Sequence, residues 1–272
     1  MKPRLLILIT AACALVGETG FGATDVPSAN TGNLDFKQWG LLAIQDGGRR
    51  KPVDTFAKEA LIRITGRSTY TDKTGRKLRP NDFVLSALVE THDWKNEPMV
   101  LISSGQLIER LGLAKTQRRF SFAELTGSAE LQRLVTEAQA LKRGEKPLTR
   151  VQQEALSVSD RLTLLAHVMD ASALLIVPAP TSETDPWVDP SGWSRYYSEA
   201  QFAPIRAQLQ TVATGYVTGD PFNFSRAANQ LRENLRALSR SIYPRDQQLR
   251  LEYFYNHFEA FIGQSGVTEL RS

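Results

Sequence analysis

Apolar residues recur every three or four positions over most of this chain, which is the spacing of a helix with one buried face. The longest such stretch, from Thr149 to about Ala171, predicts a central helix. Further helices are expected at residues 53–65, 82–89, 104–111, 122–141, 203–216, 222–241 and 245–261. The pattern therefore predicts a mainly helical fold.

Three short apolar runs bounded by turn residues predict a small β component: Leu41–Ile44, Pro98–Ile102 and Leu174–Val177. The first run leads into Asp46-Gly47-Gly48, and its glycines can adopt the positive φ of a tight hairpin, so the chain should reverse there. The expected fold class is α+β, predominantly α-helical with a small β-sheet or hairpin.

A helix start follows the hairpin. Pro52 presets φ for a first helical turn, and Asp54 places negative charge against the helix N-terminus. Gly66 is suited to end that helix in a left-handed conformation.

Prolines suggest how the chain is divided. Residues 181–192 contain Pro186 and Pro190 among serine, threonine and aspartate, which predicts an exposed connection. We expect a mainly helical domain with a small sheet at residues 34–180, and a C-terminal helical segment at residues 193–272 that packs on it. No repeat of fixed period is visible.

The first residues have the layout of a secretory signal. Lys2 and Arg4 precede an apolar run, and small residues follow up to Gly22. We expect a signal peptide at residues 1–22 and a flexible lead-in at residues 23–33. The mature chain should be exported, either periplasmic or associated with the outer side of the inner membrane. Lipidation at Cys13, and retention of the signal as an anchor, stay open.

Cys13 is the only cysteine of the chain. Removal of the signal would leave no thiol, which excludes disulfide bonds, thiol exchange and cysteine metal sites from the mature protein.

Charge is mild overall, with a formal net charge of +4 at pH 7. It lacks the concentrated basic footprint that nucleic acid requires, so we expect no nucleic-acid partner. Arg49, Arg50 and Lys51 form a local cluster that could bind an oxyanion or form a solvated rim. A second group, Arg232, Arg236 and Arg240, has helical spacing and is either a solvent face or a contact for anionic lipid.

Motifs of known enzymes are missing. The sequence contains no Gly-x-Ser-x-Gly, no His-Glu-x-x-His and no phosphate-binding Gly-Lys-Ser/Thr. His92, His167 and His257 lie far apart in sequence, so no metal site is predicted. We expect His92 at the surface or at a cap, although its neighbour Asp93 could tune it, and His167 in the core. No catalytic residue is nominated.

The strand, the glycine turn, the basic cluster and Pro52-Val53-Asp54-Thr55-Phe56-Ala57-Lys58-Glu59 together resemble the extracytoplasmic part of bacterial cytochrome c biogenesis proteins of the Ccs (ResB/ResC, system II) type. Residues 93–102, 174–180 and 252–258 show weaker similarity. These stretches cover a minor part of the chain.

The resemblance implies a non-catalytic periplasmic domain that assists cytochrome c maturation, split from or partnering a membrane haem lyase. Its partners would be membrane cytochrome c biogenesis proteins and apocytochrome c. The tryptophan-rich haem motif and the membrane histidines of that family are missing, so haem is expected only through a partner. The alternative is a periplasmic scaffold or binding module unrelated to haem. The candidate partner or anion contacts are Arg49, Arg50, Lys51, Asp54, Thr55, Tyr255 and Asn256.

Overall fold

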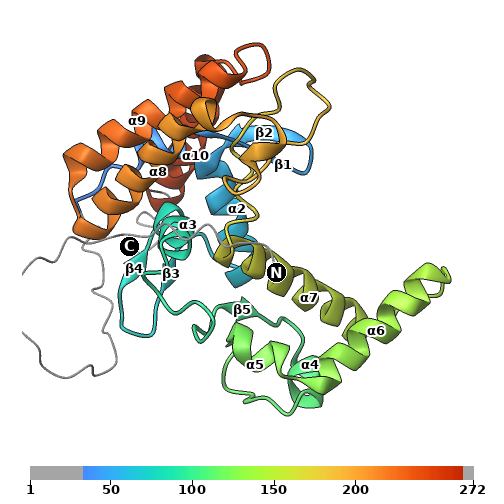
Figure 1. Cartoon of the computed structure of the whole chain (residues 1–272). Coiled ribbons are helices and arrows are strands. Elements are labelled where there is room, and N and C mark those ends of the chain that lie inside the picture. Colours follow the sequence, from blue (N-terminus) through green and yellow to red (C-terminus); the bar gives the residue numbers. More distant parts are fainter. Residues whose placement is uncertain (1–32, 266–272) are drawn as a thin grey trace, which may run out of the picture. The chain divides into compact units, whose positions relative to one another are not determined.

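The computed structural model describes residues 33–265, and their side chains as far as Phe258. It is mainly helical with three antiparallel pairs of short strands (Figure 1), which confirms the expected α+β class. The signal peptide expected at residues 1–22 and nearly all of the lead-in lie outside the described residues. Within residues 33–265, no helix is both long and apolar enough to cross a bilayer.

The chain forms two compact units. Unit 1 contains the described residues up to Phe56 and those from Leu174 to Ser265, and unit 2 contains Ala57–Ala173. Helix α2 (Val53–Thr65) begins in unit 1 and has most of its length in unit 2. The domain boundary that the sequence suggests at residues 181–192 stays a prediction.

Helices α8 (Glu199–Thr218) and α9 (Pro221–Leu238) pack side by side in unit 1 (Figure 1). Gly215 permits their close approach, because a Cβ there would lie 2.9 Å from the backbone nitrogen of Phe224. Asp220 begins α9 by accepting a hydrogen bond from the backbone N–H of Asn223. The other elements of unit 1 are α1 (Lys37–Gly40), β1 (Ala43–Asp46), β2 (Arg49–Pro52), η1 (Trp193–Arg195) and α10 (Asp246–Ser265).

The expected hairpin is confirmed. Strands β1 and β2 pair with Asp46 opposite Arg49, and Gly47 and Gly48 make the turn with φ of 57° and 81°. Helix α2 follows directly, as Pro52 and Asp54 predicted. The strand expected at residues 41–44 is shifted, because Leu41 caps the short helix α1.

Two other expectations for unit 1 were wrong. Leu174–Val177 forms no strand. Its backbone bonds to other described segments are one β-bridge, between Val177 and Val188, and one bond from the Gln45 N–H to the Leu175 carbonyl. The connection at residues 181–192 is not simply exposed either. Trp187 is 2% exposed, and its backbone N–H donates to Oε1 of Gln45 at 2.6 Å.

Helix α7 (Arg150–Met169) is the central helix of unit 2, as its periodicity predicted (Figure 1). Thr149 caps it, accepting from the N–H of Gln152. The helix packs against strand β5 and helices α3, α4, α5 and α6. Besides the rest of α2, unit 2 contains β3 (Tyr70–Thr71), β4 (Lys77–Leu78), α3 (Pro80–Leu88), β5 (Val100–Leu101), α4 (Gly105–Arg110), β6 (Arg119–Phe120), α5 (Phe122–Thr126) and α6 (Ala129–Arg143).

Two helix boundaries in unit 2 differ from the prediction. Ser121 and Glu124 form the expected capping box, but the helix that they start ends at Thr126. A separate helix, α6, then begins at Ala129. Ser128 caps it, because the Ser128 hydroxyl accepts a hydrogen bond from the backbone N–H of Leu131. Helix α3 begins at Pro80, with Asp82 accepting from the N–H of Arg79.

Candidate functional site

The three cations of the hairpin have partners within unit 1. Arg49 donates to Glu252 of α10 at 2.8 Å, and the Lys51 ammonium lies 2.7 Å from the carboxylate of Asp46. Arg50 donates to two backbone carbonyls, those of Ile242 at 3.0 Å and Glu183 at 2.6 Å. An anion at this cluster would have to compete with these bonds.

The candidate residues on α2 and α10 are brought together. The side-chain amide of Asn256 donates to the Thr55 hydroxyl at 2.8 Å and lies 3.4 Å from a carboxylate oxygen of Asp54. Asp54 and Thr55 are each 6% exposed. His257 approaches the same carboxylate at 3.8 Å. These contacts tie α10 to the start of α2 within unit 1.

Tyr255 does not join this cluster. It lies on a partly exposed apolar face of α10, and its neighbours on that face have the spacing of one helical stripe. The stripe, which we call the α10 face, consists of Leu251, Phe254, Tyr255 and Phe258, which are 57%, 57%, 57% and 47% exposed. Sequence reasoning singled out only Tyr255, although the intervals of three, four and seven residues carry the signal.

The arginine stripe of α9 is not a free basic face. Arg232 is 4% exposed and donates to the side-chain oxygen of Asn229 at 3.0 Å. Arg236 hydrogen-bonds Asp246, which raises the pKa of the guanidinium. The interpretation as a solvent face was therefore wrong for Arg232, because α9 buries that position, whereas Arg240 is exposed and lies beyond the end of α9 at Leu238.

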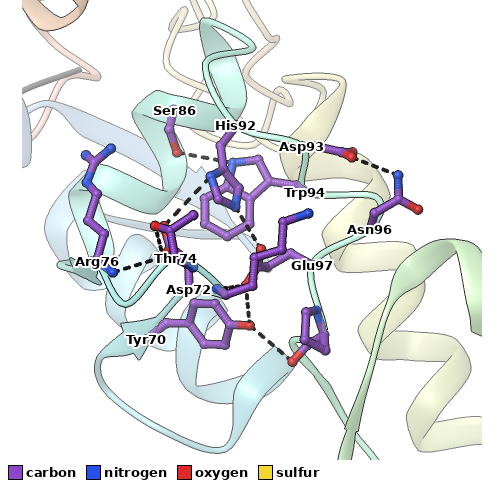
Figure 2. Close-up of polar contacts among 12 residues, drawn as sticks. Tyr70, Asp72, Thr74, Arg76, Ser86, His92, Asp93, Trp94, Asn96 and Glu97 are labelled. Atoms are coloured by element: carbon purple, nitrogen blue, oxygen red, sulfur yellow. Dashed lines mark hydrogen bonds and ion pairs between the residues drawn. The ribbon is translucent and has the colours of Figure 1, made fainter. Parts of the chain in front are cut away.

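Unit 2 contains a buried polar network that the sequence did not indicate (Figure 2). At its centre the Glu97 carboxylate, 0% exposed, accepts from the Tyr70 hydroxyl at 2.9 Å and from the Lys73 backbone N–H at 2.8 Å. Nε2 of His92 lies 3.1 Å from its other oxygen. Burial and the Glu97 carboxylate raise the pKa of Tyr70.

Asp72 is the second buried carboxylate of the network. It accepts from the backbone N–H groups of Thr74 and Arg76, each at 2.9 Å, and from the Thr74 hydroxyl at 2.6 Å. Although burial acts in the opposite direction, these hydrogen bonds hold the pKa of Asp72 below its usual value. The two carboxylates thus order the β3–β4 turn and the segment before β5.

The histidines take other places than expected. The His92 side chain is 15% exposed and lies between Glu97 and Asp72, and its ring packs against that of Trp94 in a tilted arrangement, with the ring centroids 4.2 Å apart (Figure 2). The expected core position of His167 was wrong, because its helix α7 turns that residue to solvent. Among the described residues, no group of three or more histidine, cysteine, aspartate or glutamate side chains could hold a metal ion.

No protein family model matches the chain. The chain is similar to Protein NrfI of Wolinella succinogenes, with 25% identity over 159 residues, which is 56% of this chain and 16% of that protein. The chain therefore corresponds to a small part of this relative's length.

Proposed function

We propose that this chain takes part in cytochrome c maturation as an exported, non-catalytic domain that docks on a membrane protein of the haem-attachment machinery. Haem would be held by that partner. The resemblance of the hairpin and the α10 segment to Ccs-type proteins supports this proposal. The similarity to Protein NrfI hints at the same process, cytochrome c biogenesis.

The joined hairpin and α10 carry the proposal. Two segments that are about 200 positions apart in sequence, and that both resemble the same family, are bonded to each other through Asn256 and Thr55 and through Glu252 and Arg49. Beside these bonds, the α10 face presents two phenylalanines and a tyrosine to solvent. Exposed aromatic clusters mark interaction surfaces more often than scattered apolar residues do, because aromatic side chains supply much of the binding energy at interfaces.

The test is complementation of a strain in which the gene is deleted. We expect the deletion to lower the amount of cytochrome c with covalently attached haem, measured by haem staining, and the wild-type chain to restore it. The double variant Phe254→Ser/Phe258→Ser should accumulate to the wild-type level and fail to restore haem attachment, because it removes two aromatic anchors without touching the bonds of Asn256.

Phe222→Ser is the matched control, since Phe222 is 69% exposed and lies on α9. This variant should restore haem attachment fully. Wild-type levels of haem attachment in the deletion strain would refute the proposed role in cytochrome c maturation. Restoration by the Phe254/Phe258 variant would refute the docking surface. A pull-down that returns cell-wall or transport components without biogenesis proteins would favour a scaffold unrelated to haem.

A further inference from the structure

Unit 2 has an open cleft of about 510 Å³ beside the buried network of Figure 2. Its walls come from the segment after α2, from β3 and the turn that follows it, from the residues before β5 and from those before β6. The lining residues with ionisable groups are Arg67, Tyr70, Asp72, Lys73, Glu97, Arg118 and Arg119. Four cations thus line the cleft against two carboxylates.

The two carboxylates are already hydrogen-bonded to other groups of the protein. Glu97 is 0% exposed and accepts from Tyr70 and from the backbone of Lys73, and its second oxygen faces His92. Asp72 is 7% exposed and holds the turn at Thr74. Neither carboxylate pairs with a cation of the cleft.

The cations, in contrast, have few acidic neighbours among the described residues; Asp93 lies near enough to Lys73 for their charges to interact. Within the described part of the chain, Arg67, Lys73, Arg118 and Arg119 make no ion pair. Among the described residues, the Arg119 side chain makes one hydrogen bond, from its Nε to the carbonyl of Thr65 at 2.8 Å, and its terminal N–H groups make none. Burial, and then the nearby charge of Arg67, lower the pKa of Arg119. The Arg67 and Arg119 guanidinium groups therefore repel each other, and both line the cleft.

We propose that this cleft binds a small molecule through an oxyanion group, a carboxylate or a phosphate. Guanidinium groups bind both in bidentate fashion, and an anion placed between Arg67 and Arg119 would remove their mutual repulsion. The hydroxyls of Thr69 and Thr116 and the amide of Gln117 add neutral donors to the lining. The volume falls within the range of small-molecule sites, about 300–1,000 Å³. This site is separate from the docking proposed for unit 1 and does not depend on it.

The experiment is calorimetric titration of the full chain with inorganic phosphate and, separately, with succinate, at constant ionic strength set by sodium chloride. The double variant Arg67→Gln/Arg118→Gln removes two exposed cations of the cleft. The control Arg143→Gln/Arg150→Gln removes the same charge from exposed positions on α6 and α7. Lys73→Gln is a second cleft variant, because only the backbone of Lys73 bonds to Glu97.

We expect saturable binding of one probe to the wild-type chain and to the control. Binding should weaken by about tenfold or more in the Arg67/Arg118 variant, since each charge-assisted bond contributes strongly to affinity. The probe that saturates distinguishes a phosphate site from a carboxylate site. Absence of saturation by both probes, or equal weakening in the cleft and control variants, would overturn the proposal. Far-UV circular dichroism confirms folding, and if the double variant is unfolded, Lys73→Gln decides in the same way.

Discussion

Tyr243→Phe removes one oxygen atom from the interior of unit 1. The Tyr243 hydroxyl accepts the backbone N–H of Ala43 at 2.9 Å, and its ring stacks on Trp187 with centroids 5.7 Å apart. Phenylalanine keeps the ring but leaves that buried N–H without an acceptor. We expect the free energy of unfolding at pH 7 to fall by about 1–3 kcal/mol, the usual cost of an unpaired buried donor.

The same hydroxyl gives the prediction a pH signature. Burial raises the pKa of Tyr243 from 10.0 to about 12. A group whose pKa is higher in the folded state contributes stability that is complete below the unfolded pKa and is lost as the pH rises through the folded pKa. The wild-type chain should therefore lose about 1.4 kcal/mol from this group by pH 11. The variant lacks this hydroxyl. The difference in free energy of unfolding between the two proteins should therefore narrow by that amount between pH 8 and pH 11.

Urea unfolding followed by circular dichroism at pH 7, 8, 10 and 11 measures both effects. Other groups that titrate in this range are common to the two proteins and cancel in the difference. Tyr255→Phe is the control, because Tyr255 is 57% exposed, and this variant should match the wild-type chain at every pH. Two results would refute the assigned role of the hydroxyl. One is a difference in free energy of unfolding between Tyr243→Phe and wild type that stays constant from pH 8 to pH 11, and the other is the absence of that difference at pH 7.

Two further predictions concern unit 2. Gly66→Ala should lower the free energy of unfolding by about 1–3 kcal/mol, because Gly66 has φ of 73° and a Cβ there would lie 2.8 Å from a side-chain carbon of Leu101; Gly75→Ala, also at positive φ but with open space around it, should cost less in the same urea titration. Asp72→Asn should destabilise the chain at pH 7 and less so at pH 3. The lowered pKa of Asp72 gives stability that is present above pH 3.8 and lost as the pH falls through the folded pKa, and equal destabilisation at both pH values would contradict this.

Elements set by short-range chemistry were predictable from the sequence. The hairpin turn depends on Gly47 and Gly48, and α7 begins where the Thr149 hydroxyl accepts an N–H of its own first turn. Each of these signals lies within a few residues of its effect. The run from Leu174 to Val177 differs, since a strand forms only where a second segment offers a ladder of partners. Here Pro178 and Pro180 have no N–H to donate, and the run makes an isolated bridge to Val188 and one bond with Gln45 in place of a ladder.

The candidate site was predictable only in part. The resemblance pointed to Asp54, Thr55 and Asn256 separately, but no spacing rule brings residues 201 positions apart into one hydrogen bond. The network around Glu97 was missed for a similar reason. A carboxylate followed by Pro98 looks like a loop residue in sequence, and its burial depends on donors from Tyr70 and His92 that only the fold supplies.

A comparison of the hairpin cluster with the cations of the unit 2 cleft shows what decides whether a cation can bind an anion. Arg49-Arg50-Lys51 is the densest cluster in sequence, yet Glu252, Asp46 and two carbonyls already use its charges. The cations of the unit 2 cleft are scattered from residue 67 to residue 119, and the carboxylates beside them are occupied by hydroxyl, amide and imidazole donors. Electrostatic affinity for an added anion depends on the charge that remains after internal pairing, because a paired guanidinium must first break its own bond. By that measure the cleft is the stronger anion site, although the hairpin has the more conspicuous sequence.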